Sequence, residues 1–285
     1  LAAEVLVAAE NEALKEEQLP RLVQGEVVAV LAWQEAAGNV DPGAINAQAV
    51  PFEGGFKLNG RKRYIAGAAH ADAFLVSANT TDGMAVFWVP KETAGTVLQT
   101  EPVADGRSFG TLTLHDAQLT EKHCVARGRA ATEALARALD HATAIAGAEL
   151  FGVMSCALEM SLDYLRTRVQ FGKPIGSFQG LQHRAVDLYI QTQLASAVLE
   201  EALLALARNP DARTRAALAS RIKARCSDAG LRIAREAIQL HGAMGFTDEF
   251  DIGLYLKRAL VLSAWLGNAG FHRRRYVELT AREPA

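Results

Sequence analysis

Cysteine is scarce in this 285-residue sequence. Cys124, Cys156 and Cys226 are odd in number, lie far apart and form no C-x-x-C pair, so neither a disulfide framework nor a cysteine-based metal site is expected. Long apolar runs are also missing, and nothing approaches the roughly 20 residues that a membrane-spanning helix needs. The formal net charge is only -2, which gives no sign of a nucleic-acid-binding surface. We therefore expect a metal-free protein of the reducing cytoplasm, without a membrane span and without nucleic acid as a partner.

The composition that remains is that of an ordinary globular protein. Hydrophobic residues make up 50% and charged residues 22% of the chain, and the length suggests about two domains. The first residues include neither an initiator methionine nor a basic leader. We expect that sequence before Leu1 is missing.

The first half of the chain has a strand-like pattern. Short runs rich in β-branched and aromatic residues occur at residues 27–31, 74–76, 86–89 and 112–114. Glycine, asparagine, aspartate and proline separate these runs, as turns between short strands require. The pattern predicts a small all-β domain without a helix of useful length.

The second half has a helical pattern. From Leu150 to Leu162 an apolar residue recurs every four positions, which predicts one continuous apolar helix face. Ser177 is a candidate cap for a second helix, and a third helix is expected to stop near Gly242. A fourth is expected over residues 251–275. Four long helices with short connections predict an antiparallel bundle.

Two segments of the helical half carry a family resemblance. Residues 166–175 read RTRVQFGKPI and are followed by Gln179, and residues 239–249 read QLHGAMGFTDE. Both segments resemble signature segments of the acyl-CoA dehydrogenase family, as do residues 19–26 and 58–65 in the first half. The resemblance implies an α+β fold with three parts. These are a remnant of an N-terminal helical domain (1–26), a middle β domain (27–125) and a C-terminal four-helix bundle (126–285).

The same resemblance implies a cofactor and a reaction. Members of the family bind FAD, form homotetramers or related oligomers, and oxidise acyl-CoA thioesters at the α,β bond. Each FAD lies between two subunits, and the neighbouring bundle holds its pyrophosphate and adenosine. The residues that match this half of the site are Arg168, Phe171, Gln179, Gln239 and Gly242.

These residue types suit a dinucleotide. Arg168 offers a planar fork of donors to phosphate oxygens, and Phe171 offers a flat apolar wall. The two glutamines can hydrogen-bond to polar atoms, and Gly242 lets the backbone approach a phosphate. A structural interpretation stands beside this one, because an arginine at a helix end is commonly a solvated charge and a glycine after a helix is commonly a C-cap.

The catalytic base of the family is absent from its usual positions. The reaction needs a carboxylate to remove the α-proton. The usual glutamate, which precedes a glycine, falls on Leu266 when the segments are aligned without gaps. The alternative position in the first bundle helix falls on Ala142, and the neighbouring position of a substrate-contacting arginine falls on Thr143. Asp140 is a weak alternative base.

The flavin-ring side of the β domain also departs from the family. The stretch at residues 34–41 keeps only Glu35 and Asp41 of the expected pattern, and Ala66 stands where a hydroxyl is expected. The chain thus resembles a non-catalytic subunit of the heteromeric acyl-CoA dehydrogenases of bacterial steroid side-chain catabolism, which would complete the flavin site of a different, homologous subunit in a heterotetramer. Two alternatives stay open. One is a self-sufficient dehydrogenase, oxidase or monooxygenase with a relocated base, and the other is a flavin-free structural subunit.

Overall fold

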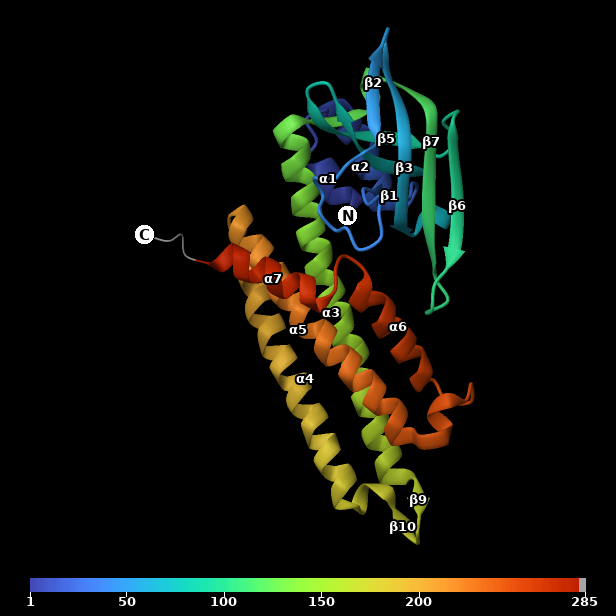
Figure 1. The fold of residues 1–285 in the computed structure, drawn as a ribbon, viewed down its shortest axis with the longest axis vertical. Helices are drawn as coiled ribbons and strands as arrows, with labels where there is room; N and C mark the ends of the chain where they lie inside the picture. Colours follow the sequence, from blue (N-terminus) through green and yellow to red (C-terminus); the bar gives the residue numbers. More distant parts are fainter. Residues whose placement is uncertain (282–285) are drawn as a thin grey trace. The chain divides into compact units, whose positions relative to one another are not determined.

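The computed structural model describes residues 1–281 (Figure 1). The chain divides into two compact units, residues 1–139 and residues 140 onward. The order of helices, β-sheet and long helices confirms the expected α+β fold class. The domain boundaries expected at residues 26/27 and 125/126 remain a proposal.

The first unit begins with two helices, α1 (Ala2–Val7) and α2 (Glu12–Gln24). The side chain of Asn11 caps α2 by accepting a hydrogen bond from the N–H of Leu14 at 3.1 Å. Gly25 ends α2 with φ of 74°, a left-handed conformation that a glycine adopts without steric cost. The sequence therefore contains both a start and a stop signal for this helix.

The rest of the first unit is one mixed sheet. Its strands are β1 (Ala29–Ala32), β2 (Gln48–Phe52), β3 (Gly55–Ala66), β4 (Ala73–Thr80), β5 (Gly83–Pro90), β6 (Thr96–Pro102), β7 (Ser108–Thr120) and β8 (Cys124–Arg127). The spatial order is β6-β7-β3-β2-β4-β5-β8, and β1 pairs with β4 in parallel. All four predicted strand runs lie in or overlap these strands, and the helical pieces between residues 27 and 127 are two 3-10 turns (Ala68–His70 and Glu121–His123), so the all-β prediction is confirmed.

The second unit is helical. Its elements are α3 (Gly128–Thr167, which begins in the first unit), the hairpin of β9 (Val169–Gln170) and β10 (Lys173–Pro174), α4 (Gln179–Leu206), α5 (Ala212–His241), α6 (Ile252–Ala264) and α7 (Ala269–Thr280). Two details differ from the prediction. The fourth helix is broken after Ala264, and Ser177 does not cap α4, because its hydroxyl donates to the carbonyl of Pro174 inside the 3-10 turn Ile175–Ser177.

Close packing of α3 against α5 depends on two glycines. A Cβ on Gly147 would collide with the side chain of Ile222, and a Cβ on Gly230 would lie 3.2 Å from a methyl carbon of Leu150. Within residues 1–281, α3 is the one helix whose length and composition would suit a membrane span. Leu150 and Met154 of that helix are fully buried in this protein, so these two side chains belong to the core of the helical unit.

Candidate functional site

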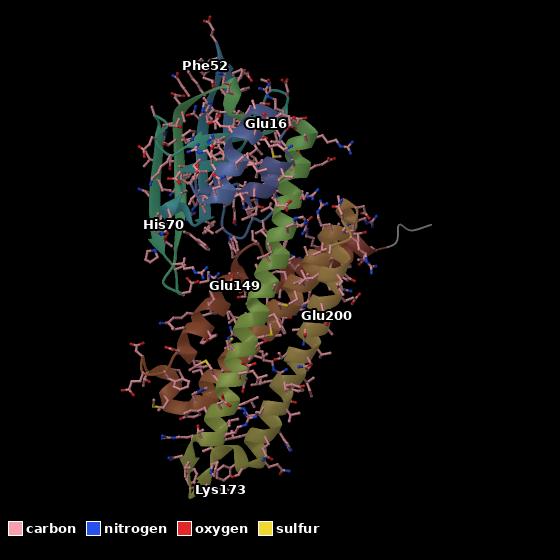
Figure 2. All side chains as sticks on the ribbon, turned by 180° about the vertical axis from the view of Figure 1, so that it is seen from behind. Glu16, Phe52, His70, Glu149, Lys173 and Glu200 are labelled. Atoms are coloured by element: carbon pink, nitrogen blue, oxygen red, sulfur yellow. The ribbon has the colours of Figure 1, made fainter. Side chains whose placement is uncertain are left out.

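The five residues expected on the adenosine side of a flavin lie at one end of the helical unit. Arg168 follows α3, Phe171 lies in the β9–β10 turn, Gln179 begins α4, Gln239 lies in the last turn of α5, and Gly242 follows it. The antiparallel course of the helices brings these chain segments to the same end (Figure 1), where Lys173 marks the hairpin in Figure 2. All five residues are exposed, and 92% of Phe171 is accessible.

Local backbone geometry presents these residues to solvent. The N–H of Ile175 donates to the carbonyl of Arg168 at 2.8 Å, which closes the hairpin. Phe171 has a positive φ of 55°, an uncommon conformation for a bulky residue that marks a tightly constrained turn. Gly242 has φ of 60°, and no atom of the described part of the chain lies within 4 Å of the place where a Cβ would stand. The space above this turn is open.

A partly buried aromatic cluster lies beside the two signature segments. The ring of Tyr164 on α3 stacks on that of His241 on α5 with centroids 4.4 Å apart, and Phe250 packs on both. His241 Nδ1 lies 2.7 Å from the carbonyl of Ala237, so this nitrogen carries the proton and Nε2 is left as an acceptor. Nε2 is buried and has no hydrogen-bond partner among residues 1–281. Burial lowers the pKa of His241, which keeps its ring neutral.

The position expected for the base lies in the break between α6 and α7. Leu266 is 4% exposed and has φ of 61°, and the following Gly267 has φ of 101°. Two consecutive residues with positive φ turn the chain sharply at this point. Leucine has no group that accepts a proton, so residue 266 cannot act as a base.

The alternative base position on α3 is equally apolar. Ala142 and Thr143 are both buried, at 7% and 3% exposure. Asp140 is buried as well, and both of its oxygens are engaged: one accepts from Arg215 at 3.2 Å and the other from Arg275 at 2.7 Å. Two guanidinium partners hold the carboxylate in place. This geometry favours a structural role for Asp140 over that of a base.

Two buried basic residues surround the α6–α7 break. Lys223 Nζ donates to the carbonyls of Gly267 at 2.8 Å and Ser263 at 3.3 Å. His272 Nε2 lies 2.9 Å from the carbonyl of Leu266, and its Nδ1 lies 3.3 Å from the hydroxyl of Ser220. Burial lowers the pKa of Lys223 to about 7 and, together with the charge of Lys223, that of His272 to about 3.

The low pKa of His272 predicts a pH dependence of stability. Between pH 6.5 and about 3 the unfolded chain binds a proton at this residue and the folded chain does not, so the free energy of unfolding falls as the pH falls through this window. The loss should reach about 1.4 kcal/mol per pH unit from this one group. Urea unfolding followed by circular dichroism from pH 7 to 4 should show a shallower slope in His272→Gln. His183→Gln, at an exposed histidine of α4, should leave the slope unchanged.

The β unit contains a second buried polar centre. Lys62 of β3 is fully buried and donates to Glu35 at 2.7 Å, to Ser77 at 3.1 Å and to the carbonyl of Trp33 at 3.3 Å. Glu35 also accepts from the amides of Asn46 and Ala47. Burial alone would raise the pKa of Glu35, but the hydrogen bonds from Lys62 and the two amides outweigh it and lower the pKa.

This ion pair joins the two stretches in which the flavin-ring pattern is altered. Glu35 belongs to residues 34–41 and Lys62 lies just before residues 64–66, and the N–H of Arg63 donates to the carbonyl of Gln34 at 2.7 Å. Asp41, the other residue kept from the family pattern, accepts from the amide of Gly43 in a local turn. The altered stretches are therefore neighbours in space, although more than 20 residues separate them in the chain.

The sequence does not indicate that several of these residues are buried at the candidate site. Lys223 and His272 sit in helical segments whose pattern is otherwise ordinary, and nothing local distinguishes a buried lysine from an exposed one. One signal was available at the break. Gly267-Asn268 combines a glycine stop with an asparagine N-cap, and the Asn268 side chain accepts from the N–H of Phe271 at 2.9 Å.

Comparisons with known proteins agree with this architecture. Residues 131–278 match the family description "Acyl-CoA dehydrogenase, C-terminal domain" and residues 31–117 match "Acyl-CoA dehydrogenase, middle domain". The chain is 30% identical over 277 residues to acyl-CoA dehydrogenase FadE27 of Mycobacterium tuberculosis, covering 93% of this chain and 72% of that protein.

Two solved structures are similar over nearly the whole chain. A chain of the ChsE4-ChsE5 complex from Mycobacterium tuberculosis has a TM-score of 0.89 and 27% identity, covering 100% of this chain and 75% of that one. A chain of the Tcur3481-Tcur3483 steroid ACAD G363A variant has a TM-score of 0.85 and 28% identity, covering 98% and 73%. With both family descriptions matched in order, this chain belongs to the acyl-CoA dehydrogenase family.

Proposed function

We propose that this chain is the supporting subunit of a heteromeric, FAD-dependent acyl-CoA dehydrogenase. The observation that carries the proposal is an asymmetry between the two halves of the site. Both positions expected for a base hold apolar side chains, Leu266 and Ala142, whereas the adenosine-side residues all lie exposed at one end of the helical unit. A chain with this combination can bind part of the cofactor without removing the α-proton of a substrate.

The exposed end of the helical unit fits the pyrophosphate and adenosine of FAD. Arg168 would hold phosphate oxygens through its planar fork of donors, and Phe171 would offer a flat surface to a ring. The open turn at Gly242 would let a phosphate approach the backbone, since no side chain obstructs it. FAD supplies the hydride acceptor of the reaction when it is bound, and this chain supplies binding and orientation.

An apolar outer face on α4 supports the proposal that a partner subunit is present. Val186, Tyr189, Ile190 and Leu194 recur at helical spacing and are each 46–56% exposed. Asp187 is the one charged residue between residues 186 and 199. A helix face of this kind is typical of a protein interface. We infer that a homologous helical unit covers it, because two similar solved structures carry the names of paired chains, ChsE4-ChsE5 and Tcur3481-Tcur3483.

The partner would be a different acyl-CoA dehydrogenase chain that carries a carboxylate at the position equivalent to residue 266. The substrate would be a bulky, ring-bearing acyl-CoA thioester, in line with the word steroid in the name of one similar structure. The reducing cytoplasm is the proposed setting, which agrees with the three cysteines being free.

Co-expression tests the proposal directly. Native mass spectrometry of this chain expressed with a homologous dehydrogenase chain should show mixed oligomers that hold FAD, and the separately purified chain should not oxidise acyl-CoA. Leu194→Asp should weaken the mixed oligomer, because it places a charge on the apolar face. The control variant Glu200→Asp on the same helix should not. A flavin-saturated homomer that oxidises acyl-CoA by itself would refute the supporting role and favour the self-sufficient alternative. Mixed oligomers without flavin would favour the flavin-free structural alternative.

A further inference from the structure

The turn between α6 and α7 places one non-glycine residue in a disfavoured backbone conformation. A left-handed conformation at a leucine costs about 1–2 kcal/mol, and Leu266 adopts it with φ of 61°. The next residue must be glycine, because a Cβ on Gly267 would lie 2.7 Å from a ring carbon of Phe271 and 3.0 Å from His272 Nε2. A strained turn persists only where the surrounding structure holds it.

Two side chains from neighbouring helices hold this turn. Lys223 of α5 donates to the carbonyls of Gly267 and Ser263, and His272 of α7 donates to the carbonyl of Leu266. These carbonyls belong to the C-terminal end of α6 and to the turn that follows it, where the partial negative charge of a helix favours a cation. We call these two side chains the turn clamp.

Burying the two side chains of the turn clamp carries a cost in desolvation free energy. Lys223 is fully buried and His272 is 1% exposed. Within residues 1–281, the hydrogen bonds of Lys223 run to backbone carbonyls and to no carboxylate, so its charge is only partly compensated. An apolar residue would fill the space at a lower desolvation cost, which indicates that the clamp serves the shape of the turn.

We propose that Lys223 and His272 are positioning residues that hold the Leu266–Gly267 turn in one conformation and thereby fix the direction of the side chain at residue 266. This inference deepens the proposed function, on which it rests for the importance of residue 266, since that residue occupies the family position of the base. It means that the backbone at this position is held in one conformation although the side chain there is a leucine.

A reporter thiol at residue 266 tests the clamp. Leu266→Cys is placed in a Cys156→Ser background, because Cys156 is exposed while Cys124 and Cys226 are buried. With the clamp intact, the introduced thiol should react slowly with a soluble thiol reagent. Lys223→Met removes the Nζ donor of both hydrogen bonds at similar size, and labelling through local opening should become about 10- to 150-fold faster. Lys223→Gln keeps an N–H donor and should give a smaller increase.

Two controls separate positioning from general stability. Lys257→Met removes an exposed lysine from α6 and should leave labelling unchanged. Lys62→Met removes an equally buried lysine from the β unit and should lower stability there without exposing the thiol at residue 266. Unchanged labelling in Lys223→Met, or an equal increase in Lys62→Met, would overturn the proposal.

A measurement on the unaltered protein covers the case in which Lys223→Met does not fold. Amide hydrogen exchange at Gly267 should be as slow as in the buried part of α5, because the clamp closes the turn. Exchange at Gly267 as fast as at the exposed end of α7 would overturn the clamp. An active homomer in the co-expression experiment would refute the supporting role and leave this result standing, so the two failures are distinguishable.

Discussion

Arg168→Ala is expected to weaken FAD binding by the assembled complex about 10- to 150-fold. A hydrogen bond to a charged group contributes about 1.5–3 kcal/mol, and each 1.4 kcal/mol is one factor of ten in affinity. The side chain is exposed at the end of the helical unit where the adenosine-side residues lie. In the proposed heteromer, activity should return toward normal in excess FAD, because the substitution does not touch the carboxylate proposed for the partner.

Titration of the flavin-depleted complex with FAD measures this effect. Arg166→Ala is the matched control, since Arg166 is also exposed but pairs with Asp163 at 2.9 Å one turn earlier in α3. It should leave FAD affinity unchanged. Arg168→Lys should restore part of the binding, because an ammonium cannot reproduce the planar fork. An unaltered dissociation constant in Arg168→Ala would mean that Arg168 is a solvated helix-end charge.

Asp140→Ala is expected to lower the free energy of unfolding of the helical unit by about 3–5 kcal/mol. The substitution leaves the guanidiniums of Arg215 and Arg275 without their shared carboxylate. Arg275 is partly exposed and regains some hydration, which favours the lower end of the range. Urea unfolding of the variant and the parent provides the measurement.

Asp163→Ala provides the control for this prediction. Asp163 lies on the same helix and forms an exposed ion pair with Arg166, so its loss should cost less than about 1 kcal/mol. Asp140→Asn tests the remaining catalytic alternative. If the carboxylate is structural, this variant should retain most dehydrogenation activity in a complex that stays folded. A loss of several orders of magnitude in a stable complex would assign the base to Asp140.

The order and type of the elements could be predicted from the sequence. Runs of β-branched and aromatic residues between turn residues mark strands, and an apolar residue every four positions marks α3. These signals are local, because each depends on residues within one or two turns of the chain. The two signature segments are also continuous in sequence, so the candidate residues for FAD could be named before the structure was known.

The break of the fourth helix was missed although its signal is local. The apolar residues of α6 continue the helical period up to the turn, and this periodicity favoured one continuous helix. The glycine and asparagine that end one helix and begin the next were therefore given too little weight. Lys223 of α5 and His272 of α7 add tertiary contacts to the carbonyls of Gly267 and Leu266 at this break.

What the sequence by itself determined is the family fold, the candidate residues for the adenosine side and the presence of leucine, not a carboxylate, at residue 266. Only the tertiary structure decided what the buried charges do. Asp140 meets Arg215 and Arg275, which lie 75 and 135 residues further along the chain, and Lys223 meets the carbonyl of Gly267 after 44 residues. The energy of a charge depends on its burial and on its partners. Both follow from packing between distant segments, so no local pattern reveals whether an aspartate or a lysine is solvated or holds the site in place.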